Sequence, residues 1–184
     1  SMPQLKSAYA ILLSLGFKYR SIIKALSSFQ GVPHRIEQVA SHDGIIFIND
    51  SAATIPEAVH FSYSRFRDLA VHLICGGTDK NLSPDGMAEE LEGAVSLSLL
   101  DGSFTRTKLL PLLKEHKIDY MGPFSTMDDA LAASYHEALA KHTQVPNLIQ
   151  VILLSPGAAS FELFVNEFDR RDQFKALVSA LVSP

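Results

Sequence analysis

The sequence contains a single cysteine and no long apolar run. Cys75 cannot form an intramolecular disulfide bond and offers no metal-site spacing, so within "VHLICGG" it is predicted to be a small core residue. No apolar segment approaches the roughly 20 residues that a membrane-spanning helix requires, and the N-terminus has no signal-peptide pattern. These absences favour a reducing, cytoplasmic location and no membrane partner.

An excess of positive charge is also absent. The chain has 16 Lys and Arg against 20 Asp and Glu, a formal net charge of -4. Because the chain as a whole has no excess of positive charge to attract nucleic acid or anionic lipid, we expect a small-molecule ligand and no nucleic-acid partner. We also expect a monomer.

The length and composition are those of an ordinary globular protein. With 184 residues, 47% of them apolar and 20% charged, the chain is long enough for one well-packed domain and a small appendage. The opening Ser1-Met2 resembles the scar of a cleaved expression tag. The chain is therefore expected to be a piece of something longer.

The sequence pattern changes near Gly31. Residues 4–29 predict two short helices, because apolar residues recur at helical spacing and Gly16 interrupts them where a helix could end. Within residues 35–50 the period becomes two on either side of His42-Asp43-Gly44, which predicts a β-hairpin.

After the hairpin, helical and strand patterns alternate. Helices are predicted near 56–66, 84–92, 104–116, 126–141 and 171–182. Strands are predicted near 70–75, 95–100, 118–121 and 148–154. The runs "AVHLIC", "VSLSLL" and "IQVILL" are typical of strands covered on both faces of a parallel sheet. The pattern predicts a Rossmann-like, doubly wound α/β sheet, mostly parallel, with an initial antiparallel hairpin and a short helical segment before it.

Small and polar residues follow each predicted strand, at the edge where open α/β sheets bind ligands. These segments are "NDSAAT" (49–54), "GGTDKN" (76–81), "DGS" (101–103), "GPFST" (122–126) and "SPGAASF" (155–161). For 101–103 and 122–126, ordinary turn chemistry is a sufficient explanation. The other three add chargeable or reactive groups, namely Asp50 with Ser51, Asp79 with Lys80, and Ser160.

Lys80 follows two glycines, which would let the backbone approach a phosphate while the ammonium supplies a point charge. "GGTDK" is not a P-loop, because the required Gly-x-x-x-x-Gly-Lys-Ser/Thr spacing occurs nowhere in the chain. The motif alone is therefore weak evidence for a phosphate site.

Four ordered motifs carry a more specific resemblance: "GVPHRIE" (31–37), "FINDSAAT" (47–54), "LICGGTDKN" (73–81) and "LLSPGAASFELF" (153–164). In this order and at these separations they resemble the C-terminal domain of the Mur ligase family. The resemblance covers roughly residues 31–176. It implies a division into residues 1–30, a tag scar with the terminal helices of the central ATPase domain, and residues 31–184, the C-terminal domain.

The resemblance implies an ATP-dependent reaction of peptidoglycan-precursor synthesis. Among the reactions of this family, the residues found in these motifs favour one. In it, ATP phosphorylates the carboxylate of UDP-N-acetylmuramoyl-L-alanine and the D-glutamate amine attacks the acyl phosphate. In this family the phosphate loop and the Mg²⁺ ligands belong to the central domain, and the uridine nucleotide is held mainly by the N-terminal domain. We therefore expect the chain to be about the last third of an enzyme, inactive without those domains, with no metal ligand of its own.

The resemblance also implies roles for individual residues. Lys80 is the candidate catalytic residue, which would help to place nucleotide and acceptor. The candidate nucleotide-binding residues are His34, Arg35, Asp50 and Asp79, the first two at the interdomain hinge. The candidate substrate-binding residues are Ser51, Asn81, Ser160, Phe161 and Arg171.

Simpler interpretations exist for several of these residues. His34 could be a turn residue after Pro33, and Arg35 a solvated strand residue. Ser160 could cap the N-terminus of a helix with Glu162 in its first turn.

The sequence departs from the family pattern at the proposed acceptor site. Ala52 stands where lysine is usual, Ile55 where a second asparagine is usual and Arg171 where glycine is usual, and Glu167 and Phe168 are in swapped order. A D-glutamate acceptor brings two carboxylates that need a cation or several donors. The hypothesis is that Lys80 or an arginine of the 170–171 pair provides that cation. The simpler interpretation of Arg171 is a solvated residue on a helix surface.

Two other functions stay open at this point. One is a freestanding, non-catalytic nucleotide-binding or interaction module, in which residues 4–29 would pack onto the sheet and complete the domain. The other is the equivalent domain of a sister ligase, either another Mur ligase or a folylpolyglutamate synthetase.

Overall fold

The computed structural model describes residues 2–29 and 32–183, and the chain divides into two compact units, residues 1–32 and 33–184. The first unit consists of α1 (Met2–Ser14) and α2 (Tyr19–Ser27), as the helical periodicity predicted. Gly16 joins them with a φ of 83°, in the left-handed region that suits glycine. None of the described helices is long and apolar enough to cross a membrane.

The second unit is built on a six-stranded sheet in the order β1-β2-β6-β3-β4-β5. The strands are β1 (Glu37–His42), β2 (Ile45–Asn49), β3 (Ala70–Gly76), β4 (Ser96–Leu100), β5 (Met121–Phe124) and β6 (Gln150–Leu154). The β1 and β2 strands are antiparallel, and the other neighbouring pairs are parallel. The predicted doubly wound, mostly parallel sheet with an initial hairpin is confirmed.

The hairpin turn has the chemistry that its sequence predicted. Asp43 and Gly44 have φ values of 48° and 75°, as both central residues of a two-residue hairpin turn require. A shift of register between Gln38 and Ala40 then places Glu37 opposite Asn49 at the other end of the hairpin. These two residues take part in the site described below.

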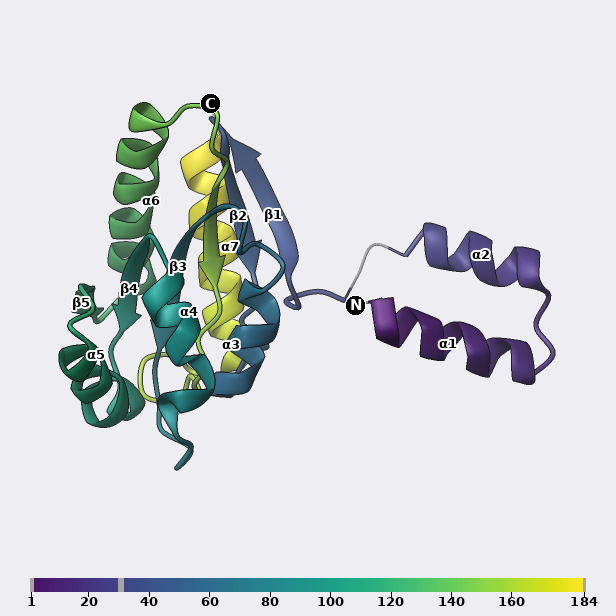
Figure 1. The fold of residues 1–184 in the computed structure, drawn as a ribbon, viewed down its shortest axis with the longest axis horizontal. Helices are drawn as coiled ribbons and strands as arrows, with labels where there is room; N and C mark the ends of the chain where they lie inside the picture. Colours follow the sequence, from purple (N-terminus) through teal and green to yellow (C-terminus); the bar gives the residue numbers. More distant parts are fainter. Residues whose placement is uncertain (1, 30–31, 184) are drawn as a thin grey trace. The chain divides into compact units, whose positions relative to one another are not determined.

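Helices cover both faces of the sheet (Figure 1). On one face, the core includes residues of α3 (Pro56–Tyr63), α4 (Ala88–Gly93) and α5 (Leu110–His116). On the other face, it includes residues of α6 (Met127–Gln144) and α7 (Glu167–Val182). All seven residues of the central β3 strand are buried, and burial raises the pKa of the Cys75 thiol to about 12, so its prediction as a core residue is confirmed.

Two helix predictions are modified at their first turns. The segment predicted at 84–92 begins as a 3₁₀-helix, Pro84–Met87, whose Ser83 cap accepts a hydrogen bond from the Asp85 N–H. The segment predicted at 104–116 begins as a π-helical turn, Thr105–Leu109. Pro111 lacks an N–H to continue the α-helical ladder there, which gives a physical reason for the irregular turn.

Two other predicted boundaries were wrong. The fifth strand begins at Met121 rather than near residue 118, because Lys117 adopts a left-handed conformation and the Ile118 N–H bonds to Leu113 O, which ends α5. The last helix begins at Glu167 rather than 171, because the Asn166 side chain caps it by accepting from the Asp169 N–H at 2.9 Å.

Candidate functional site

The carboxyl ends of the five parallel strands form one edge of the sheet, where the predicted site segments lie. Since β6 lies between β2 and β3, the loop after β6 emerges between the loops after those two strands. This is the crevice in which open α/β sheets bind ligands. The structure groups most of the predicted residues into two sets, one around the end of β2 and one around the end of β3.

A cavity of about 330 Å³ lies at the end of β2 beside the start of α7. Its lining residues are Pro33, His34, Ser51, Ala52, Thr54, Phe168 and Arg171. We call it the β2-end cavity. It brings together three of the predicted site residues, and its lining offers a guanidinium, an imidazole and two hydroxyls but no carboxylate.

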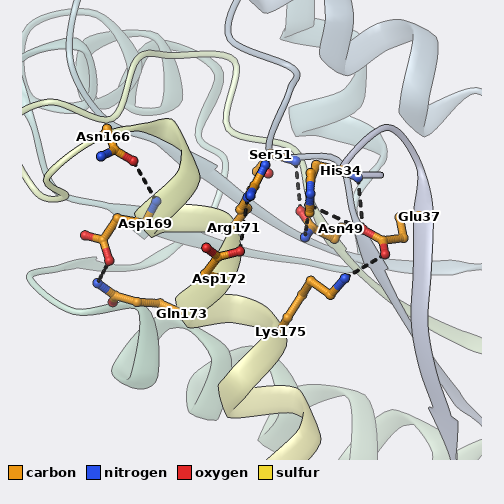
Figure 2. A network of polar contacts seen from close by, with 10 residues as sticks. All are labelled: His34, Glu37, Asn49, Ser51, Asn166, Asp169, Arg171, Asp172, Gln173 and Lys175. Atoms are coloured by element: carbon orange, nitrogen blue, oxygen red, sulfur yellow. Dashed lines mark hydrogen bonds and ion pairs between the residues drawn. The ribbon is translucent and has the colours of Figure 1, made fainter. Parts of the chain in front are cut away.

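His34 is fixed in this cavity by its backbone and by β2. It has a φ of 64°, its N–H donates to Glu37 Oε2 at 2.9 Å, and its carbonyl accepts from the Ala52 N–H at 3.2 Å. Glu37 Oε1 in turn accepts from Lys175 Nζ at 2.7 Å, so α7 is tied to the start of β1 (Figure 2). His34 is therefore a turn residue, as the simpler interpretation held, and it also lines the cavity.

Burial and the nearby positive charges favour the neutral form of His34, against the opposing effect of Glu37. Burial lowers the pKa of His34, and the positive charge of Arg171 lowers it further. A neutral ring lets Nδ1 accept from Asn49 Nδ2, 3.4 Å away, while Asn49 Oδ1 accepts from the Ser51 N–H at 3.1 Å. Burial alone would raise the pKa of Glu37, but the hydrogen bonds from Lys175 and the His34 N–H outweigh it and lower that pKa.

Asp50 is buried behind the cavity rather than lining it. Its Oδ1 accepts from the Ile36 N–H at 3.1 Å, and its Oδ2 accepts from Ser62 and, at 3.3 Å, from Ser155. Burial raises the pKa of Asp50, partly offset by these hydrogen bonds. The carboxylate therefore joins the segment before β1, the α3 helix and the end of β6.

The two neighbouring arginines of α7 have different environments. Arg170 is fully buried, and its guanidinium donates to Ala158 O at 3.0 Å and to Ser51 O at 2.9 Å. It thus holds the loops after β6 and β2 together. The sequence had offered it as a substrate-facing cation, but its side chain lies in the interior.

Arg171, by contrast, lines the cavity. Its guanidinium carbon lies 4.5 Å from the centroid of the Phe168 ring, and its Nε donates to Asp172 Oδ1 at 3.0 Å. Its side chain is 28% exposed, so it is neither a core residue nor a fully solvated one.

The second set of predicted residues follows β3. Asp79 and Asn81 form a local turn, in which the Asn81 N–H donates to Asp79 Oδ1 at 2.8 Å, and Lys80 is exposed beside them. Ser103 Oγ accepts from the Asp79 N–H at 2.9 Å and donates to Glu162. The loops after β3, β4 and β6 are therefore joined to one another.

Close packing explains the second glycine of "GGTDKN". Gly77 has a φ of 137°, and a Cβ placed on it would lie 2.4 Å from Ala159 O. The neighbouring Thr78 pairs with Ala159 as an isolated bridge. This glycine is required by the approach of two loops, whether or not a phosphate binds there.

Ser160 and Phe161 lie on the loop after β6 and do not line the β2-end cavity. Phe161 is 65% exposed, whereas Ser160 is buried and its Oγ has no hydrogen-bond partner within the described residues. A turn rather than a helix follows Ser160, so its interpretation as a helix cap was wrong. Arg35 is exposed and also lies outside the cavity lining.

Sequence reasoning missed several residues of the first set: Glu37, Asn49, Thr54, Phe168 and Lys175. Asn49 and Thr54 are in the "NDSAAT" segment and could have been included with Ser51. The spacing of Phe168 and Arg171, three residues apart on one helix, was a second available signal. The contacts of Glu37 and Lys175 join residues 138 positions apart and have no local signal.

Two other features lie away from the predicted residues. A larger cavity, of about 620 Å³, is lined by residues of 106–120 along α5 and contains none of them. Within the described residues, His60, Glu89 and Glu90 are close enough together to hold a metal ion, but they are on α3 and α4 and are not among the predicted residues either. Neither feature therefore contains a ligand-binding residue that the sequence predicted.

No family model matches the chain. Individual relatives do match: it is 38% identical over 183 residues to the UDP-N-acetylmuramoylalanine–D-glutamate ligase of Roseiflexus sp. strain RS-1, and 41% identical over 159 residues to that of Treponema pallidum strain Nichols. These alignments cover 98% and 86% of this chain. The chain spans only 37% and 28% of the two ligases, about a third of their length.

Solved structures show the same fold at much lower identity. The UDP-N-acetylmuramate-alanine ligase MurC of Thermotoga maritima matches 96% of this chain with a TM-score of 0.63 and 15% identity. The MurF ligase of the same organism, solved in complex with ADP, matches 94% with a TM-score of 0.57 and 16% identity. The chain covers 36% and 37% of these two structures.

Proposed function

Because this chain belongs to the Mur ligase family, we propose that it is the C-terminal domain, with preceding helices, of an ATP-dependent ligase that adds D-glutamate to UDP-N-acetylmuramoyl-L-alanine. The observation that carries this proposal is the similarity of nearly the whole chain to D-glutamate ligases about three times its length. Under this proposal, the full-length protein is a cytoplasmic enzyme of peptidoglycan-precursor synthesis.

The proposed reaction proceeds through an acyl phosphate. ATP transfers its γ-phosphoryl group to the carboxylate of UDP-N-acetylmuramoyl-L-alanine, the D-glutamate amine attacks the acyl carbon, and phosphate leaves as the amide forms. Two anionic substrates and an amine must be held together while charge develops, so positioning and electrostatic stabilisation supply most of the rate enhancement.

The residues of this chain would take part mainly in positioning. Lys80, exposed on the loop after β3, is a cation free to approach nucleotide and acceptor. His34 and Ser51 both line the β2-end cavity, where His34 would contact the nucleotide and Ser51 the acceptor. The buried Asp50 would act through the segment before β1, because its carboxylate bonds the Ile36 N–H. The ligands of Mg²⁺ and most phosphate contacts are expected in the rest of the ligase.

The test is phosphate release by the full-length ligase that contains this sequence. Release should require ATP, UDP-N-acetylmuramoyl-L-alanine and D-glutamate together, and the 184-residue chain alone should release none. Lys80→Ala should lower kcat/KM about 100-fold, the effect of losing a group that stabilises developing charge. Because Lys80 is exposed, its removal should leave thermal stability near that of the wild type.

Lys114→Ala is the matched control, since Lys114 is an exposed lysine on α5. It should leave kcat/KM unchanged. Full activity of Lys80→Ala would mean that the loop after β3 is only a turn, and phosphate release without D-glutamate would overturn the proposed acceptor.

A further inference from the structure

We infer that Arg171 is the anion-binding cation of the β2-end cavity and holds a carboxylate or phosphate group of a substrate there. The inference rests on the proposed function for the identity of that substrate, but the anion chemistry follows from the cavity itself. Its lining combines one guanidinium with two hydroxyls and an imidazole and includes no carboxylate. The carboxylates next to Arg171 and His34, those of Asp172 and Glu37, do not line the cavity. A cavity of about 330 Å³ is of the size that takes a small ligand.

The geometry of Arg171 leaves its donors available to such a ligand. Phe168 supports one face of the guanidinium at 4.5 Å, and Asp172 takes only Nε, at 3.0 Å. No acceptor among the described residues 33–183 takes a hydrogen bond from its two terminal amino groups. A planar guanidinium held in this way can bind a carboxylate or a phosphate at two points.

The other cations near this edge of the sheet are less suited to the role. Arg170 is fully buried and bonds Ala158 O and Ser51 O. Lys175 is paired with Glu37 at 2.7 Å. Lys80 is on the loop after β3 and does not line the cavity. Of the arginines and lysines of 33–183, only Arg171 is part of the cavity lining.

Ala52 supplies no cation to the cavity that it shares with Arg171. The two residues line the same cavity, one from the loop after β2 and the other from α7. The alanine methyl group leaves space and offers no donor, so among residues 33–183 the positive charge that lines the cavity comes from α7. The influence of Arg171 on the pKa of His34 is consistent with a guanidinium whose field reaches across the cavity.

Binding to the 184-residue chain tests the anion site directly. Amide chemical shifts of Ser51, Ala52 and Thr54 and the Nε–Hε signal of Arg171 are followed by NMR during titration with D-glutamate and, separately, with inorganic phosphate. In the wild type these signals should shift together with one of the anions. Arg171→Gln should abolish the shifts, whereas Arg65→Gln should preserve them. Arg65 is the matched control because it is an exposed arginine over a phenylalanine, Phe61, outside the cavity.

Steady-state kinetics of the full-length ligase then distinguish the source of the anion. Arg171→Gln should raise the KM of one substrate about 10- to 100-fold, the effect of losing a charge-assisted hydrogen bond, and change kcat little. A rise for D-glutamate alone identifies a carboxylate of the acceptor, and a rise for ATP alone identifies a nucleotide phosphate. Adding Ala52→Lys to Arg171→Gln should restore part of the lost affinity by supplying a cation from the opposite side.

Unchanged KM values for ATP and D-glutamate in Arg171→Gln, together with unchanged NMR titrations, would overturn the inference. A wild-type ligase that does not respond to D-glutamate at all would instead overturn the proposed function. In that case the phosphate titration still decides whether Arg171 makes the cavity an anion site.

Discussion

At the scale of single residues, two adjacent arginines of α7 have different roles, one in the protein interior and the other at the cavity. Arg170 points into the protein and bonds two loop carbonyls, whereas Arg171 lines the β2-end cavity. Residues 170 and 171 are one position apart on a helix and therefore face different directions. Nothing in the local sequence "DRRD" tells one role from the other.

This division predicts effects of very different size on the free energy of unfolding. Arg170→Leu would leave Ala158 O and Ser51 O without their buried donor, so it should lower the free energy of unfolding by about 2–4 kcal/mol. Arg171→Gln should change it by less than about 0.5 kcal/mol, because it removes only a partly exposed ion pair and a ring contact. Urea unfolding of the two variants measures both values. Equal losses in the two variants would contradict the assigned roles.

At the scale of secondary-structure elements, the strands were predictable where burial dictates their composition. The β3, β4 and β6 strands are nearly continuous apolar runs because helices cover both faces, and the sequence displays this directly. The errors concern the ends of elements. The left-handed Lys117 and the Asn166 cap set two boundaries through hydrogen bonds that apolar periodicity does not report.

The site was predictable only in part for a related reason. The order of strands brings the loops after β2, β6 and β3 to one edge, and each loop carries polar residues that were visible in the sequence. Which of them meet depends on α7, whose Phe168 and Arg171 complete the cavity and whose Lys175 reaches Glu37. Such contacts between distant segments depend on packing, so the sequence alone left Lys80 and both arginines as candidates for one cation and favoured Arg171 only because it stands where glycine is usual.

A buried histidine on β3 contacts residues of two neighbouring strands. Its burial predicts how the stability of the sheet unit depends on pH. His72 on β3 contacts Ser96 Oγ of β4 through Nδ1 at 2.8 Å and Gln150 Oε1 of β6 through Nε2 at 3.1 Å. Burial lowers the pKa of His72, with weaker opposing effects from Gln150 and Glu137. The unfolded chain therefore binds a proton at a higher pH than the native protein does, and stability should fall as the pH drops below about 6.5.

Urea unfolding between pH 7.5 and pH 5 measures this dependence. His72→Gln, which keeps a polar side chain between the strands, should make the profile less steep, leaving the contribution of His34, whose pKa is also lowered by burial. His136→Gln is the control, because His136 is 84% exposed. A wild-type profile that is flat below pH 6.5 would show that His72 is not held neutral by its burial.

At the scale of the whole molecule, the sheet unit has two apolar clusters of its own, one on each face of the sheet. The described part of the helical unit has one buried apolar residue, Ile22, and several exposed ones, including Ile11 at 58% and Leu15 at 67%. A pair of short helices with so little burial is marginal in isolation. Stability of the chain should therefore come from residues 33–184.

Deletion of residues 1–32 tests this view and separates two of the functions considered. If the sheet unit carries the core, residues 33–184 should keep a Tm within about 3 °C of the intact chain, equivalent to no more than about 1 kcal/mol for a domain of this size. The excised helices alone should show little helical signal in far-UV circular dichroism, because they lack an apolar surface to pack against. A larger fall in Tm would mean that residues 4–29 complete the sheet domain. That result is expected of a freestanding module, whereas in a ligase the exposed apolar side chains of the helices would be covered by the rest of the enzyme.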